Sequence, residues 1–392
     1  ALTKISIGFL ALAAAALWFT SCSSEDVAQN GGGLNEKDQR VLLLSVNTGN
    51  LGTRSALTDD EKQINDMTVG IYDKSGNYRV VASLASGSAD KEASGTAPGT
   101  FTTTSGANVK VVTSTLQEDD QVLVAVNRGD AAFTSKPSPA DFSNVTMDAT
   151  TALQFKASST DIDATKFPKF GTAKLPAGNN STFTATVSVK NLVSKVTLED
   201  LSVSFTGPYA NATFTPSEIF LLNVPDKLAF STTGQSGTST YLNGTDIDKN
   251  GGKTGTKTAV LATATTGASA LGSGSASYTA KPILYTIPNS NSTSNKTILV
   301  ITGKFKKDAS ATEETVYYPL ALNEHYDSSH PTGAAADGGT KSQTLAGKNY
   351  KCTVVIKTIG ASNPWVTTGP QTAELTVNVA DWDDADQTTT FE

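Results

Sequence analysis

Val41-Leu42-Leu43-Leu44-Ser45-Val46 is an apolar hexamer followed by the turn-favouring residues 47–50, Asn-Thr-Gly-Asn. It predicts one buried strand. Similar short segments recur between turn-forming Gly, Asn, Pro and Ser residues. We expect further strands at residues 67–72, 78–82, 109–113, 121–126, 183–189, 196–205, 219–224, 283–287, 298–305, 315–320, 350–359 and 373–379. Many short strands with no amphipathic helix of useful length predict an all-β fold, whose first strands suggest an antiparallel meander.

The composition supports this fold class. Charged residues make up 17% and hydrophobic residues 38% of the 392 residues, and Thr, Ser, Ala, Gly and Val are abundant, which favours short strands. The length suits two ordinary domains. We place their boundary near Leu192, which gives two tandem β-sandwich domains at residues 55–192 and 193–392, with a long surface loop or strand excursion at about 231–277. The net charge of −7 and the lack of a Lys/Arg cluster argue against nucleic acid as a partner.

The N-terminus has the features of an export signal. Residues 5–19 are apolar, which is the length of a signal-peptide core and too short to span a membrane. Small residues before Cys22 and polar residues after it resemble a bacterial lipobox, so we expect residues 1–21 to be a lipoprotein signal peptide and Cys22 to be acylated. Phe19 stands where leucine is usual, which leaves an ordinary signal peptide with an incidental cysteine as the alternative.

If Cys22 is acylated, Cys352 is the only other cysteine of the chain. It lies in a strand-like run, so we expect a small buried hydrophobe and no disulfide.

The sequence offers little for catalysis. G-x-S-x-G, H-E-x-x-H and P-loop patterns do not occur. His325 and His330, with Asp327 between them, lack a fourth zinc ligand, so surface histidines are the better interpretation. We expect no enzymatic activity, no cofactor and no metal site.

Two weaker patterns have alternative interpretations. Asp246, Asp248, Asn250 and Gly251 match the first half of a calcium loop, but Lys257 stands where a glutamate should close it, so we expect a polar turn. A set of aromatic residues could line a glycan platform, although Tyr and Trp at strand positions usually belong to a core or its rim. These residues are Tyr72, Tyr285, Tyr317, Tyr318 and Trp365.

The order of features along the chain is more specific than any one of them. Cys22, a glycine-containing tether, the strand 41–46, Arg54 and the strand 67–72 follow one another. Further matching segments are Leu123–Gly129, Tyr317-Tyr318-Pro319, Asn349–Trp382 and Gln387–Phe391. Over nearly its whole length the chain resembles the FimA-like major fimbrial subunits of Bacteroidia, the type V pilins.

The resemblance implies transthyretin-like or Greek-key sandwiches in a cell-surface fimbria whose lipidated precursor is held at the outer membrane. It also implies a trypsin-like, Arg-specific protease that cuts between the first strand and the domain. We expect this cut between Arg54 and Ser55, which makes residues 22–54 a propeptide. Arg40 competes less well, because a cut there leaves the strand attached. The removable strand would contribute Val41, Leu42, Leu43, Leu44 and Val46.

The same resemblance implies that a strand from an identical subunit, the donor strand, fills the groove that the removed strand leaves. We expect the donor at the C-terminus, where Leu375, Val377 and Val379 alternate with polar residues and Phe391 adds a second piece. Such contacts run head to tail and propagate a fibre, with anchor and tip fimbrial proteins at its ends. Truncation before Ala373 should then leave a folded subunit that cannot propagate. The alternative is an uncleaved lipoprotein: a surface glycan-binding protein, or a fimbrial anchor or tip.

Overall fold

The computed structural model describes residues 40–48, 58–85, 99–102, 106–113, 115–134, 136–177, 181–274, 277–278, 280–336, 339–366 and 369–381. Residues 39–392 form one compact unit, and the other unit, residues 1–38, lies outside the described residues. None of the helices in the described ranges is long and apolar enough to span a membrane.

Strands dominate the described part of the chain, which confirms the predicted all-β class. The strands of the first half are β1 (Arg40–Thr48), β2 (Asp66–Tyr72), β3 (Tyr78–Ala85), β4 (Gly99–Thr102), β5 (Gly106–Thr113), β6 (Gln121–Val126), β7 (Thr146–Asp148), β8 (Lys169–Lys174) and β9 (Thr182–Asn191). Those of the second half are β10 (Ser194–Val203), β11 (Thr213–Leu222), β12 (Val224–Pro225), β13 (Lys227–Ala229), β14 (Tyr241–Leu242), β15 (Ala262–Ala264), β16 (Leu271–Gly272), β17 (Ile283–Thr286), β18 (Ile298–Lys306), β19 (Glu314–Ala321), β20 (Glu324–His325), β21 (Ala334–Ala335), β22 (Lys348–Ile356) and β23 (Ala373–Asp381).

Helices are short. They are α1 (Asp59–Lys62), α2 (Pro139–Ser143), α3 (Ala149–Ala152) and the 3-10 turns η2 (Ala164–Lys166), η3 (Gly207–Tyr209) and η4 (Ala259–Leu261). Thr58 and Glu61 close a capping box at the start of α1, and Ser138 caps α2.

The first sandwich is an eight-stranded sheet in the order β3-β2-β6-β8-β9-β1-β5-β4. Its two halves meet at β8 and β9, which share only the pairs Lys169↔Asn191 and Phe170↔Lys190. The halves face each other across one apolar cluster, to which β2 and β6 contribute from one side and β1, β5 and β9 from the other. Gly171 lets β8 approach β9, because a Cβ there would lie 2.4 Å from the carbonyl oxygen of Ser188.

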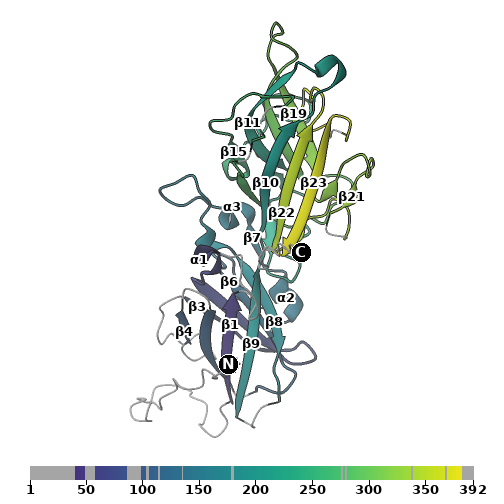
Figure 1. Cartoon of the computed structure of the whole chain (residues 1–392). Coiled ribbons are helices and arrows are strands. Elements are labelled where there is room, and N and C mark those ends of the chain that lie inside the picture. Colours follow the sequence, from purple (N-terminus) through teal and green to yellow (C-terminus); the bar gives the residue numbers. More distant parts are fainter. Residues whose placement is uncertain are drawn as a thin grey trace, which may run out of the picture. The chain divides into compact units, whose positions relative to one another are not determined.

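The second sandwich packs two further sheets. One has the order β17-β10-β22-β23, and Figure 1 shows β10, β22 and β23 side by side. The other has the order β15-β11-β18-β19, with β16 also on β11. The inward side chains of both sheets belong to one core cluster, which includes Leu198, Leu221, Ile301 and Val354.

The structure corrects the expected meander and decides between a surface loop and a strand excursion for residues 231–274. The first strands do not form a meander, because β1 pairs with β5 and β9 and runs parallel to β9. Residues 231–274 contain β14, β15 and β16, and Leu261 and Leu271 there are buried, so most of the expected loop is a strand excursion. The boundary expected near Leu192 falls between β9 and β10, but β7 pairs with β13 across it. The division into two domains stays a prediction.

Candidate functional site

The strand β1 occupies the middle of its half-sheet. It pairs antiparallel with β5 from Arg40↔Thr113 to Asn47↔Gly106, and parallel with β9 from Val41↔Thr182 to Thr48↔Val189. Figure 1 shows β1 beside β9. Both edges of β1 are therefore bonded, and its removal would leave the β1 slot, a strand-shaped space between β5 and β9.

One face of β1 is a continuous part of the core. Leu42, Leu44 and Val46 are exposed at 0%, 1% and 0%. Val41 and Leu43 point to the opposite face and are half-buried. The predicted buried strand is thus confirmed over residues 41–46, with the alternation that a sheet with one buried face requires.

The inward leucines should carry most of the stability that β1 contributes. We expect Leu44→Ala to lower the free energy of unfolding by about 2–5 kcal/mol, because it removes buried contacts and leaves a cavity. Leu43→Ala, the matched change on the other face, should cost about 1 kcal/mol. Urea unfolding of both full-length variants measures the difference. Equal losses would contradict a single inward face.

The N-terminal end of β1 is held in place. Val41 donates its backbone N–H to the carbonyl oxygen of Ser181 at 2.7 Å, and the Arg40 guanidinium donates to the carbonyl oxygen of Leu116. Proteases need an exposed segment that they can bind in extended form. Arg40 is therefore a poor cleavage site while β1 is in its slot.

The chain is anchored again at α1. Glu61 accepts from the backbone N–H of Thr58 at 2.8 Å, and its other carboxylate oxygen lies 2.9 Å from Lys195 Nζ in a largely buried ion pair. Residues 49–57 between β1 and α1, with Arg54 and Ser55, lie outside the described residues, as does Cys22. Their predicted roles stay predictions.

The C-terminal strand β23 is an edge strand. It pairs with β22 from Lys348↔Asp381 to Ile356↔Ala373. Leu375 and Val377 are exposed at 0% and 1% in the protein's own core, and Val379 is half-buried. Phe391 lies outside the described residues. The expectation that a chain cut before Ala373 would fold is not supported, because that cut removes core side chains.

A short segment covers part of the free edge of β23. Tyr326 exchanges two backbone hydrogen bonds with Leu375, at 2.7 and 2.8 Å. Val377 donates its backbone N–H to Nδ1 of His325 at 3.3 Å. A donor strand made from β23 would have to break these bonds as well as the β22 ladder.

The two histidines are neighbours. Their rings lie 5.8 Å apart, His330 Nδ1 lies 2.9 Å from the Asp327 carboxylate, and His330 is exposed whereas His325 is half-buried. In the described ranges, no three His, Cys, Asp or Glu side chains are grouped as a metal ion would require.

The half calcium loop forms a polar turn, as expected. The Asp248 carboxylate accepts from the backbone N–H groups of Asn250 and Gly252 at 2.8 and 3.0 Å. The hydroxyl of Thr254, then the N–H of Gly252, hold the pKa of Asp248 below its usual value. Lys257 pairs with Glu218 instead of facing Asp248.

The five aromatic side chains do not form one surface. Tyr72 and Tyr318 are fully buried in the core. Tyr285 packs on Phe167, with ring centroids 4.9 Å apart. Tyr317 and Trp365 lie on a separate cluster on the outer face of β11 and β18, where Trp365 Nε1 donates to the carbonyl oxygen of Ile247 at 2.8 Å. These five side chains therefore do not provide the shared surface that a glycan platform would need.

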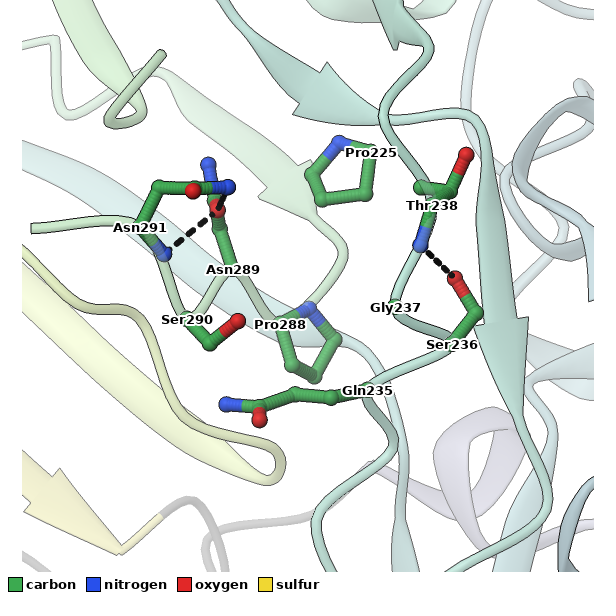
Figure 2. Close-up of a pocket in the computed structure, with 9 residues that line it drawn as sticks. All are labelled: Pro225, Gln235, Ser236, Gly237, Thr238, Pro288, Asn289, Ser290 and Asn291. Atoms are coloured by element: carbon green, nitrogen blue, oxygen red, sulfur yellow. Dashed lines mark hydrogen bonds between the residues drawn. The ribbon is translucent and has the colours of Figure 1, made fainter. Parts of the chain in front are cut away.

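A small polar pocket lies beside β12. Figure 2 shows its lining, in which the prolines Pro225 and Pro288 sit among the polar side chains of Gln235, Asn289 and Asn291. Its volume is about 10 Å³, which holds about one water molecule. It is too small for a sugar.

Cys352 behaves as expected for a buried hydrophobe. It is fully buried on β22, and burial, with a smaller contribution from Glu199, raises the pKa of its thiol to about 12. Such a thiol is unreactive at neutral pH.

Sequence reasoning did not identify the walls of the β1 slot. These are Val109 and Val111 on β5, and Phe183, Ala185 and Val187 on β9, all of them buried. Their alternation was visible in the sequence and predicted strands. Nothing local showed that these strands flank residues 41–46.

Comparisons with known proteins bear on the fold. No protein-family model matches the chain, and no curated protein sequence matches it. Among solved structures, a candidate cell adhesion protein from Bacteroides eggerthii aligns over 88% of this chain and 96% of its own, with a TM-score of 0.57 and 18% identity. Another candidate cell adhesion protein, from Parabacteroides distasonis, aligns over 88% and 98%, with a TM-score of 0.59 and 12% identity.

A fimbrilin from Porphyromonas gingivalis aligns over 88% of this chain and 99% of its own, with a TM-score of 0.55 and 15% identity. At such low identity the likeness establishes the fold, and function has to be argued from the site. The chain therefore has the β-sandwich fold of these proteins, a fimbrilin among them, and the resemblance seen in its sequence is confirmed at the level of the fold.

Proposed function

We propose that this chain is the stalk subunit of a cell-surface fimbria and polymerises by strand exchange, in support of adhesion. The observation that carries the proposal is the position of β1. It is bonded on both edges, it fills the core with three aliphatic side chains, and it precedes every other described strand. A single cut after it would leave β1 held by non-covalent contacts alone.

The proposed sequence of events begins with export as a lipoprotein acylated at Cys22, which holds the precursor at the outer membrane. A trypsin-like, Arg-specific protease then cuts between Arg54 and Ser55, and β1 leaves. The C-terminal segment of an identical subunit, residues 373–392, takes its place. Anchor and tip fimbrial proteins would end the fibre.

The geometry of the β1 slot defines what can fill it. An incoming strand has to run parallel to β9 and antiparallel to β5, with alternate apolar side chains at the positions of Leu42, Leu44 and Val46. Leu375, Val377 and Val379 have that spacing. Burial of three such side chains is worth about 4.5–9 kcal/mol, and it would replace the burial that Leu375 and Val377 already have in their own subunit.

Backbone pairing also favours exchange. As an edge strand, β23 has one long ladder, of nine residue pairs with β22. In the β1 slot it would have two ladders, of eight pairs each, as β1 has. Donor and acceptor lie on different parts of the chain, so the contact is heterologous and propagates an open fibre. Such a joint would dissociate very slowly.

The proposed role is structural and not catalytic. The features in support are the high pKa of the buried Cys352 thiol and the engagement of Nδ1 of both histidines, by the Val377 N–H and the Asp327 carboxylate. Turnover lost on mutation of His325 or His330 would contradict this assignment.

Limited trypsin digestion of the non-lipidated protein tests the proposal. We expect one early cut after Arg54, read by N-terminal mass, followed by multimers that resist SDS on a gel. A product that stays whole and monomeric would instead favour an uncleaved anchor or tip. Saturable sugar binding by such a product would favour a glycan-binding lipoprotein.

A further inference from the structure

The strand β1 is what connects β5 to the rest of its sheet. Within the described ranges, β5 pairs only with β1 and β4. On the other side, β9 pairs with β8 at only two residue pairs, near its C-terminal end. When β1 leaves, β5 loses its link to the sheet and most of β9 loses its partner.

The directions of these strands allow them to pair with each other. Because β1 runs antiparallel to β5 and parallel to β9, β5 and β9 run antiparallel to one another. Two antiparallel strands with free edges can form a direct ladder once they move to one strand spacing, about 4.8 Å.

The registers match without any slide along the strands. Leu42 lies between Val111 and Phe183, and Leu44 lies between Val109 and Ala185. All four flanking side chains are buried on the same inward face as the leucines. Closing the gap therefore brings Val111 opposite Phe183 and Val109 opposite Ala185, and these four side chains still face the core.

We infer that the β1 slot closes when it is empty, by direct antiparallel pairing of β5 with β9. Closure satisfies the edge N–H and C=O groups that β1 exposes on leaving and fills the space of Leu42, Leu44 and Val46. The biological occasion for closure rests on the proposed function. A cleaved subunit would then be inert until a donor strand reopens the slot, which limits unwanted pairing with other strands.

A disulfide reporter distinguishes the open from the closed slot. With β1 in place, the Cα atoms of residues 109 and 185 lie two strand spacings apart, roughly 9.6 Å. A disulfide needs Cα atoms at about 4.4–6.8 Å. The reporter is the full-length chain with Val109→Cys and Ala185→Cys, and with Cys22→Ser so that the buried Cys352 is the only other thiol.

Charged residues on the inward face of β1 should expel it from the intact chain. In the reporter carrying Leu42→Asp and Leu44→Asp, we expect the 109–185 cross-link to form at least tenfold faster under mild oxidation than in the reporter with native β1. Peptide mapping without reductant measures it. Faster trypsin cleavage after Arg40 reports that β1 has left, because Arg40 is held within β1 in the native chain.

Matched controls separate closure from unfolding. Leu43→Asp lies on the outward face and should leave the cross-linking rate low. The off-register pair Val109→Cys and Val189→Cys should not cross-link when β1 is expelled, whereas an unfolded chain would join either pair. A folded chain that has lost β1 and still gives no 109–185 cross-link would overturn the inference, as would equal cross-linking of both pairs.

If the double aspartate variant does not fold, the reporter with native β1 is cut with trypsin after Arg54. Mass spectrometry then measures the loss of peptide 1–54. Cross-linking should follow that loss, and an excess of a peptide of residues 40–48 should suppress it. Loss of the peptide without a cross-link would overturn closure. The aspartate variant needs neither cleavage nor polymerisation, so failure of the proposed function would leave this test intact.

Discussion

Replacement of Arg54 by alanine is expected to abolish polymerisation and to leave the fold unchanged. Arg54 is the only Lys or Arg between Arg40 and Lys62, so it is the only place where a trypsin-like protease can separate β1 from α1. Without the cut, β1 stays covalently attached and, even if displaced, can rebind at high local concentration. The measurement is the size distribution of SDS-resistant multimers on a gel after protease treatment. For Arg54→Ala, only monomer should remain.

The conservative variant Arg54→Lys provides the control. Trypsin cuts after lysine as well, so trypsin-treated Arg54→Lys should form multimers, whereas a strictly Arg-specific protease should leave it monomeric. Both variants should unfold within about 0.5 kcal/mol of the native chain, because Arg54 stands in a polar stretch of the sequence that predicts no core strand. Fibres of normal length from Arg54→Ala would refute cleavage at this position.

Two C-terminal truncations are expected to have very different effects. Removal of residues 373–392 deletes the core side chains Leu375 and Val377, so it should lower the free energy of unfolding by at least about 4 kcal/mol. Removal of residues 382–392 keeps all of β23, so it should cost much less stability than the longer truncation. It should still shorten the multimers, because the second donor piece with Phe391 is lost. Urea unfolding and gel laddering measure the two effects.

The outcomes separate the two roles of the C-terminus. Equal stability of both truncations would show that β23 is dispensable for the subunit's own fold, contrary to its burial. Multimers of normal length from the chain without residues 373–392 would exclude a C-terminal donor altogether.

Local sequence patterns were sufficient for the fold class and for most strands. Residues 121–126 were predicted as a strand and form β6 with the same bounds, and 298–305 and 315–320 agree with β18 and β19 to within a residue at each end. The apolar hexamer at 41–46, followed by turn-favouring residues, also predicted a buried strand. These signals are local, because the side chains of a strand alternate between faces whatever the strand pairs with.

The strand β8 was missed, since its sequence, Lys-Phe-Gly-Thr-Ala-Lys, looks polar. Lys169 is nevertheless buried, because its Nζ donates to the carbonyl oxygens of Phe167 and Gln63 at 2.9 and 3.2 Å. Partners contributed by distant residues made a lysine compatible with the core.

Pairing between strands was decided only in the folded chain. The apolar hexamer at 41–46 indicated a buried strand, but not which of its faces points into the core, nor that β1 lies between β5 and β9 and runs parallel to β9. Neither neighbour is adjacent in sequence, and pairing over such separations depends on which arrangement buries all the apolar faces together. The sequence by itself therefore sufficed to predict a strand at residues 41–46, whereas the tertiary structure decided that this strand connects the two sides of its sheet.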